Sequence, residues 1–333
     1  KYSFNMNNYS WLERKLHQFA LSSQFMREAM FDLERLIFSD KAQENTQDHI
    51  FIAGLARSGT TILLNAIYGS KQFASLSYDD MPFILSPNLW SKLNFTKKHL
   101  EPKERAHGDN IKISTNSPEA FEEVFWNTFS GKPEKEKLFK EYIFLILNKN
   151  KKTRYLSKNN NNIRRLVEIK KIYPKAKILI PFRDPLQHAN SLLFQHKKFL
   201  EDQKNDLFVL EYMGLIGHSE FGLGYKPVSF MNTEFRNEAS LNHWLEQWFL
   251  VYKNILTQTL ETKNFYPICY ESLCSNPEYW SQLEELLKIE HCFEENFVES
   301  KKEILNSFDK GLLTKSINLY ADLIKISLKK LSV

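Results

Sequence analysis

A short apolar run at residues 49–53 leads directly into the sequence Gly-Leu-Ala-Arg-Ser-Gly-Thr-Thr, which spans Gly54–Thr61. A strand that ends in a glycine-bounded loop and opens a helix forms a cradle for phosphate. Backbone N–H groups of such a loop converge on the anion, and the positive end of the helix dipole adds to the attraction. The sequence therefore predicts a strand, a phosphate-binding loop and a helix in this order.

The loop differs from the form found in nucleoside triphosphatases, Gly-x4-Gly-Lys-Ser/Thr. Thr60 stands where a lysine would reach the β- and γ-phosphates, and the cation is Arg57, which precedes the second glycine. A loop without that lysine is poorly suited to a magnesium-bound triphosphate. It suits a single 5′-phosphate that carries one transferable group, although a purely structural glycine turn is the alternative at this point.

A second apolar run, at residues 177–182, is followed by Arg183-Asp184-Pro185. Asp184 is expected to cap a helix whose first residue is Pro185. Ser191 then lies about two turns into that helix, on the side that returns towards Arg183. An arginine at the end of a strand and a serine on the next helix can bind one phosphate by charge and by hydroxyl. Each residue alone is also compatible with a structural role.

Together, the two motifs resemble those of the sulfotransferase family that uses 3′-phosphoadenosine 5′-phosphosulfate (PAPS). The family pattern Pro-(Lys/Arg)-Ser-Gly-Thr-Thr is matched by residues 56–61, with Ala56 in place of the proline. The family motif Arg-(Asp/Asn)-Pro with a later serine is matched by Arg183-Asp184-Pro185 and Ser191. In addition, residues 155–159 are similar to the strand-plus-lysine segment of the protein-tyrosine and bacterial members.

The resemblance implies a role for each of these residues. Lys158 would be the cation near the sulfonate in the transition state, and Arg57 would offset the charge of the leaving 5′-phosphate. PAPS would be the sulfonate donor, and no metal ion would be needed. The residues implied in binding the donor are Arg57, Ser58, Gly59, Thr60, Thr61, Arg183 and Ser191.

The residue that takes the proton of the acceptor hydroxyl has several candidates. Protein-tyrosine sulfotransferases have a glutamate downstream of the loop arginine, and the corresponding stretch here contains Asp79 and Asp80. Adjacent carboxylates in an extended segment point to opposite sides, so only one of the two would face the site. We expect Asp79 to be the base, and Asp80 is the next candidate or a helix cap. Cytosolic members use a histidine instead, which leaves His107 and His218 as further candidates.

The chain of 333 residues is 42% hydrophobic, which is enough for a large core. Strand candidates are mostly separated by long helical stretches, and they lie at residues 49–53, 154–156, 176–182 and 265–270. We therefore predict an α/β fold with three layers, in which a parallel sheet is flanked by helices as in P-loop nucleotide kinases. We expect a single sulfotransferase domain over residues 1–333, with a helical segment, 1–45, packed on it.

Charge, hydropathy and cysteine content bear on partners and compartment. The net charge of +5 comes without zinc, helix-turn-helix or RNP patterns, so no nucleic-acid partner is expected. No run of apolar residues is long enough for a membrane span, and no signal-peptide pattern is present. The three cysteines lack metal-ligand spacing and favour a reducing, cytoplasmic compartment, although a removed leader before Lys1 stays open.

The predicted activity is transfer of a sulfonate from PAPS to an acceptor hydroxyl on a carbohydrate, phenol or small alcohol. One alternative is a P-loop small-molecule kinase, which the missing loop lysine disfavours. Another is a non-catalytic nucleotide-binding protein, which the joint presence of both motifs disfavours. Residues 106–129 and 212–226 have no assigned role towards the donor, so acceptor contacts are expected there. The oligomeric state stays open.

Overall fold

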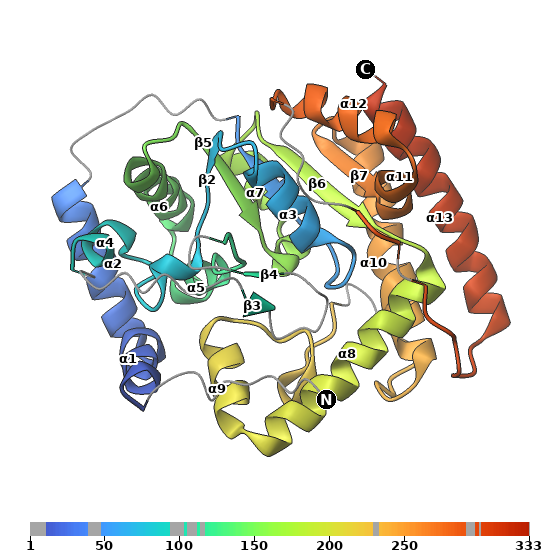
Figure 1. Ribbon diagram of the computed structural model, residues 1–333, viewed down its shortest axis with the longest axis horizontal. Helices are drawn as coiled ribbons and strands as arrows, with labels where there is room; N and C mark the ends of the chain where they lie inside the picture. Colours follow the sequence, from blue (N-terminus) through green and yellow to red (C-terminus); the bar gives the residue numbers. More distant parts are fainter. Residues whose placement is uncertain are drawn as a thin grey trace.

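A five-stranded parallel sheet lies at the centre of the molecule (Figure 1). The computed structural model describes residues 11–38, 48–93, 103–104, 112–113, 117–228, 233–290, 297–299 and 301–332. In spatial order, the strands of the sheet are β2 (Phe73–Ala74), β5 (Arg154–Lys158), β1 (Ile50–Ile52), β6 (Lys177–Phe182) and β7 (Phe265–Cys269). Every neighbouring pair is parallel, and Ile50 of β1 lies opposite both Leu156 and Lys177.

Helices from most of the described segments surround this sheet. They are α1 (Trp11–Ser22), α2 (Gln24–Phe38), α3 (Thr60–Tyr68), α4 (Pro87–Leu93), α5 (Glu123–Thr128), α6 (Lys135–Asn150), α7 (Leu166–Ile172), α8 (Pro185–Asn205), α9 (Leu207–Leu215), α10 (Leu241–Glu261), α11 (Tyr270–Ser275), α12 (Pro277–Leu287) and α13 (Lys310–Leu331). The 3₁₀ helices of the described residues are η2 (Tyr78–Asp80), η3 (Asn160–Arg164) and η4 (Gly222–Gly224). A separate antiparallel pair consists of β3 (Lys103–Glu104) and β4 (Lys112–Ile113).

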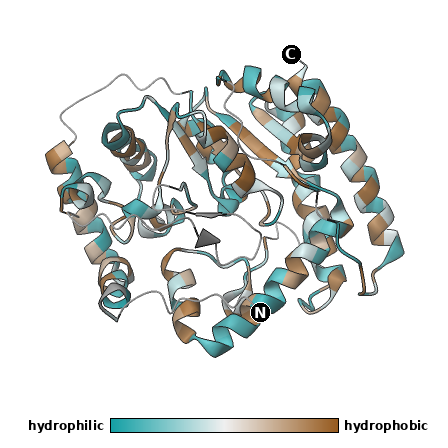
Figure 2. Ribbon diagram, in the orientation of Figure 1, coloured by the Kyte–Doolittle hydropathy of each residue, from teal (hydrophilic) through white to brown (hydrophobic). Residues whose placement is uncertain are grey.

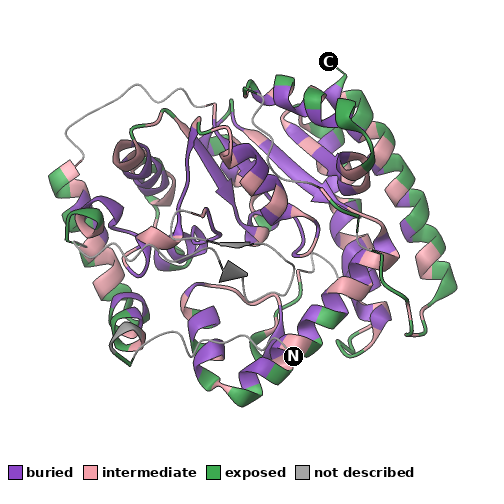
Figure 3. Ribbon diagram, viewed as in Figure 1, coloured by how far each residue is buried: buried purple, intermediate pink, exposed green. Residues whose placement is uncertain are grey.

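Burial explains why these segments become strands of a parallel sheet. The strands β1 and β6 consist largely of Ile, Leu and Phe, and all but the first residue of β6 is buried (Figure 3). Near-continuous apolar runs of this kind are typical of strands that are covered on both faces. The outer surface of α13 is exposed and carries most of that helix's hydrophilic residues (Figure 2). The predicted α/β fold, with a parallel sheet flanked by helices, is confirmed.

The N-terminal helices are joined to the rest of the structure through a buried carboxylate, Glu34 on α2. It accepts hydrogen bonds from the backbone N–H groups of Asn88 and Leu89, at 2.7 and 2.9 Å, and so caps the start of α4. Burial raises the pKa of Glu34, and these hydrogen bonds oppose the rise. Residues 11–38 contain the helices α1 and α2. The single domain over residues 1–333, with the segment 1–45 packed on it, stays a prediction.

Two further features of the described residues bear on the sequence expectations. None of their helices combines the length and the apolar character that crossing a membrane requires. In the same part of the chain, Cys269 and Cys274 are free thiols, and Cys292 lies outside it.

Candidate functional site

The predicted phosphate loop connects β1 to α3 at the carboxyl end of the sheet. Its backbone takes positive φ angles at Arg57 (68°) and Gly59 (97°). A Cβ atom added to Gly59 would lie only 2.4 Å from Cδ2 of Tyr270, so both the conformation and the close approach require glycine. Thr60 begins α3, and N–H groups of a first helical turn have no partner within the helix. The loop is thus shaped to direct N–H groups at an anion.

A buried histidine on α8 holds this loop in place. The Nε2 atom of His188 lies 2.8 Å from the carbonyl oxygen of Ala56. Burial lowers the pKa of His188 to about 3, and the charges of Arg183 and Arg57 lower it further. The ring is therefore neutral at pH 7, and Nε2 donates its hydrogen to the carbonyl. Sequence analysis did not assign this residue, because nothing in the pattern of α8 distinguishes His188 from an ordinary packing residue.

Three cations and one hydroxyl gather beside the loop. Arg183, which follows β6, donates from Nη1 to the carbonyl oxygen of Arg57 at 3.4 Å. Arg57 in turn donates from Nε to Oγ of Ser191 on α8, also at 3.4 Å. Burial lowers the pKa of Lys302, and the charges of Arg57 and Arg183 add to this effect. The structure thus brings together the predicted Arg57, Arg183 and Ser191, and it adds Lys302, which sequence analysis missed.

The turn that carries Arg183 is fixed at both of its ends. Asp184 caps α8 as predicted, since its Oδ1 accepts a hydrogen bond from the backbone of Gln187 at 2.8 Å. The backbone N–H of Asp184 donates to Oε1 of Glu271 on α11, at 2.9 Å. The other oxygen of Glu271 accepts from the hydroxyl of Tyr320 at 2.9 Å. Glu271 therefore connects the Arg183 turn to α13 and restricts where the guanidinium can lie.

Lys158 ends β5 and lies opposite Ile52, directly before the phosphate loop. Its Nζ is 3.5 Å from Oε1 of Glu119, and the two side chains are only 6% and 7% exposed. Glu119 also accepts hydrogen bonds from the hydroxyl of Tyr78 and the backbone N–H of Ala120, each at 2.8 Å. Glu119 falls within residues 106–129, where acceptor contacts are expected. The sequence carries no signal that separates it from the other glutamates there.

The asparagines after Lys158 tie this lysine's strand to the loop. Asn160 accepts a hydrogen bond from the hydroxyl of Thr60 at 3.5 Å. Asn159 caps η3 and donates to Glu123 at 2.7 Å. Glu123 is itself held by an ion pair with Arg165 at 2.8 Å. These contacts hold the end of β5 beside the first residue of α3.

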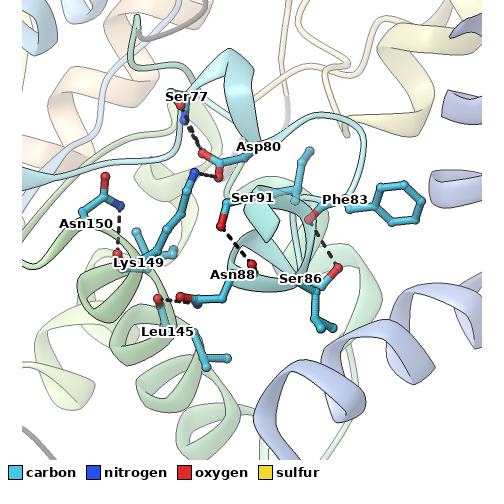
Figure 4. A network of polar contacts seen from close by, with 12 residues as sticks. Ser77, Asp80, Phe83, Ser86, Asn88, Ser91, Leu145, Lys149 and Asn150 are labelled. Atoms are coloured by element: carbon cyan, nitrogen blue, oxygen red, sulfur yellow. Dashed lines mark hydrogen bonds and ion pairs between the residues drawn. The ribbon is translucent and has the colours of Figure 1, made fainter. Parts of the chain in front are cut away.

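Asp80 occupies a structural position (Figure 4). Its Oδ2 accepts hydrogen bonds from the backbone N–H and the hydroxyl of Ser77, at 2.8 and 3.2 Å, and its Oδ1 pairs with Lys149. These contacts cap η2, so residues 78–80 form a helical turn rather than the extended segment that the sequence suggested. Both neighbouring carboxylates, Asp80 and Asp79, add to the effect of burial in raising the pKa of Tyr68 on α3.

The remaining candidates for the base differ in their surroundings. Asp79 is partly exposed and forms no hydrogen bond or ion pair with the described residues. The Nε2 atom of His218 lies 3.1 Å from the carbonyl oxygen of Ala120, the residue after Glu119. His107 lies outside the described residues.

Residues 49–212 match the family model described as "Sulfotransferase family". The matched segment belongs to the sulfotransferase family. It includes both phosphate motifs and Lys158. No curated protein matches the chain in sequence.

The solved structures that are similar to the chain include three sulfotransferases. Sulfotransferase STF9 from Mycobacterium avium is 13% identical, with 95% of this chain and 79% of that chain covered and a TM-score of 0.47. Sulfotransferase STF1 from Mycobacterium tuberculosis H37Rv is 11% identical, with 98% and 88% covered and a TM-score of 0.48. A sulfotransferase from Alicyclobacillus acidocaldarius is 13% identical, with 86% and 95% covered and a TM-score of 0.36.

Proposed function

We propose that this protein transfers a sulfonate group from PAPS to the hydroxyl of a carbohydrate, phenol or small alcohol. The family match supports a sulfotransferase. The observation that carries the choice of donor is the cluster of Arg57, Arg183 and Lys302 with the hydroxyl of Ser191, beside a glycine loop at a helix N-terminus. A nucleotide with phosphate groups at both its 3′ and 5′ positions matches such an arrangement of positive charge.

The surroundings of Lys302 support this fit. Partial burial lowers its pKa, and repulsion from Arg57 and Arg183 lowers it further, so the three positive charges are near enough to interact. Binding of a doubly phosphorylated nucleotide would relieve this repulsion. When bound, PAPS supplies an activated sulfonate on a phosphate leaving group.

The roles of the side chains follow from their places. The loop N–H groups, Arg57, Thr60 and Thr61 hold the 5′-phosphate and offset its growing charge, while Ser58 and Gly59 shape the loop. Arg183 and Ser191 hold the 3′-phosphate and so fix the register of the nucleotide. Lys158 places a positive charge at the sulfonate, so the proposal involves no metal ion. For the base, the family resemblance points first to Asp79, and Asp80, His107 and His218 are the other candidates. In the described part of the chain, no cluster of three or more His, Cys, Asp or Glu residues is suited to bind a metal ion.

The donor assignment is tested by comparing adenosine 3′,5′-bisphosphate (PAP) with AMP in titration calorimetry. Each charge-assisted hydrogen bond to the 3′-phosphate is worth roughly 1.5–3 kcal/mol, so PAP should bind at least about tenfold more tightly. In the Ser191→Ala variant this preference should shrink, because one hydroxyl contact to the 3′-phosphate is lost. Equal affinity of the wild-type protein for PAP and AMP would contradict the 3′-phosphate site.

A further inference from the structure

A carboxylate, an ammonium group and a tyrosine hydroxyl meet next to the phosphate loop. The backbone N–H of Glu119 donates to the carbonyl oxygen of Leu76 at 3.0 Å, so its segment runs beside the chain that leads into η2. This pairing brings Glu119 against Tyr78, whose hydroxyl donates to Oε2 at 2.8 Å. Lys158 reaches Oε1 from the end of β5, at 3.5 Å. The three groups thus come from three separate segments of the chain.

The contact between Lys158 and Glu119 is suited to exchange. Its length of 3.5 Å exceeds the roughly 2.7–2.9 Å of a tight charge-assisted hydrogen bond. Glu119 also has two donors that do not depend on Lys158, namely the hydroxyl of Tyr78 and the backbone N–H of Ala120. Movement of the lysine would therefore leave the buried carboxylate hydrogen-bonded, which avoids the cost of an unsatisfied charge.

We propose that Glu119 is the base that takes the proton of the acceptor hydroxyl, and that Lys158 leaves Glu119 for the sulfonate when PAPS binds. This inference rests on the proposed sulfotransferase function. It makes Glu119 part of the reacting centre, and it links donor binding to release of the base. Before the donor binds, the ammonium of Lys158 neutralises Glu119. Afterwards, the carboxylate accepts a hydrogen bond from the acceptor.

The proposed step balances in atoms and charge. The acceptor oxygen forms a bond to sulfur while its proton passes to an oxygen of Glu119. The bond between sulfur and the 5′-phosphate oxygen breaks, and its electron pair stays on the phosphate, where Arg57 offsets the charge. Glu119 then gives its proton to water. A base of this kind is needed when the acceptor hydroxyl has a high pKa, as in a sugar or an aliphatic alcohol.

The other candidates have contacts that are less suited to this step. The contacts of Asp80 with Ser77 cap η2, and its other oxygen pairs with Lys149, so this carboxylate stabilises the turn. The ring of His218 is hydrogen-bonded to the backbone carbonyl oxygen of Ala120. Asp79 has no hydrogen bond or ion pair with a described residue that would orient it, whereas Glu119 is held and lies in contact with Lys158. Asp79 is nevertheless on the same turn as Tyr78, so it is the competitor that the experiment must separate.

The first experiment measures donor binding and requires no acceptor. Glu119→Gln keeps the shape of the side chain but removes its charge. PAPS should bind about three- to tenfold more tightly to this variant, because Lys158 no longer has to leave a carboxylate. PAP lacks the sulfonate, so its affinity should stay within about twofold of wild type. Calorimetric titrations that show equal changes for PAPS and PAP, or none for either, would overturn the exchange.

The matched control for this charge removal is Glu34→Gln. Glu34 is also a buried carboxylate with backbone donors, but it lies on α2, away from the loop (Figure 1). Its removal should leave the affinities for PAPS and PAP unchanged. Thermal unfolding of each variant verifies that it is folded.

If Glu119→Gln does not fold, Tyr78→Phe provides the second variant, since it removes one donor to Glu119 without a change of charge. That variant should raise the ratio of PAPS to PAP affinity less than twofold while lowering transfer about tenfold.

The second experiment measures transfer of labelled sulfonate from PAPS to substituted phenols whose pKa values run from about 5 to about 10. Glu119→Gln should lower kcat by about 10²–10⁴ for the least acidic phenol and much less for the most acidic one, which is already ionised. Glu119→Asp should recover part of the loss. Asp79→Asn should stay within a few-fold of wild type. The reverse pattern, with Asp79→Asn inactive and Glu119→Gln active, would make Asp79 the base.

Failure of this inference is distinguishable from failure of the proposed function. A wild-type protein that binds neither PAP nor PAPS contradicts the sulfotransferase function itself. A wild-type protein that binds PAPS while Glu119→Gln equals it in both assays contradicts only the role of Glu119. If the wild-type protein binds PAPS but sulfates none of the phenols, the ratio of PAPS to PAP affinity in Glu119→Gln alone decides whether Lys158 exchanges its partner.

Discussion

Replacement of Gly59 by alanine tests whether the shape of the phosphate loop depends on the ring of Tyr270. The residue has a φ of 97°, which costs an alanine about 1–2 kcal/mol. The added Cβ would also lie 2.4 and 2.8 Å from two carbons of the Tyr270 ring. The ring is 8% exposed, and its hydroxyl donates to the carbonyl oxygen of Val298 at 3.1 Å, so it cannot swing away freely. Overpacking of this kind costs a further 1–3 kcal/mol or so.

Gly131 provides the matched control. Its φ is 79°, but a Cβ added there would meet nothing within 4 Å. Gly131→Ala therefore carries the conformational cost and the altered entropy of the unfolded chain, without the collision. In urea unfolding, Gly59→Ala should lose about 1–3 kcal/mol more than Gly131→Ala.

Binding should separate the two glycine variants as well. The guanidinium of Arg183 lies 5.6 Å from the centre of the Tyr270 ring, so a displaced ring disturbs the phosphate site. PAP affinity should fall at least about tenfold in Gly59→Ala and stay unchanged in Gly131→Ala. Equal losses of stability in the two variants, with unaltered PAP binding in both, would refute the argument that this loop is fixed by its contact with Tyr270.

Arg183→Ala should weaken PAP binding at least about tenfold, whereas Lys158→Ala should lower mainly kcat. Calorimetry measures the first effect and single-turnover rates the second. Turnover at the wild-type rate in Lys158→Ala would exclude a role of this lysine in the transfer step. In urea unfolding, Asp80→Ala should lower the free energy of unfolding by about 3 kcal/mol, because Lys149 is left without its carboxylate partner. A loss below about 0.5 kcal/mol would show that this ion pair does not stabilise the fold. The pKa of His188 in the folded protein is about 3, which is below its ordinary value of 6.5. The stability that this neutral ring contributes is complete above pH 6.5 and is lost as the pH falls towards 3. The loss is about 1.4 kcal/mol per pH unit at most. His188→Gln should show a shallower loss over this range in pH-dependent unfolding, and an equal slope would contradict a buried neutral ring.

The sheet and the loop could be predicted because their signals are local. An apolar run followed by glycine and a helix start specifies a strand, a turn and a helix from adjacent residues. Asp184 and Pro185 mark the start of α8 in the same way, and the structure has this cap. Parallel strands place their carboxyl ends at one edge of the sheet, so Gly54, Lys158 and Arg183, each at or just after the end of a strand, fall at the same edge. The neighbourhood of Arg57, Arg183 and Ser191 follows from these rules.

The residues that sequence analysis missed depend on contacts between distant segments. Lys302 lies far along the chain from both arginines, in a stretch without a regular helix or strand. His188 is hydrogen-bonded to the carbonyl oxygen of Ala56, a loop residue more than a hundred positions earlier in the chain. Neither the hydropathy of a segment nor its spacing carries information about such a partner. A lysine or histidine of this kind is identified only when the fold brings its partner near.

The glutamates of the segment before and within α5 show why a carboxylate's role is set by its partners. Glu119, Glu122 and Glu123 are all buried and lie within a few residues of one another. Within the described residues, the donors to Glu122 are neutral, among them the hydroxyl of Tyr155 at 3.0 Å, and Glu123 forms an ion pair with Arg165. Only Glu119 of these three faces Lys158, whose ammonium has a competing anion in the proposed donor. The same residue type therefore supports the fold at two positions and meets the reacting groups at the third, a difference that originates in the pairing of residue 119 with Leu76.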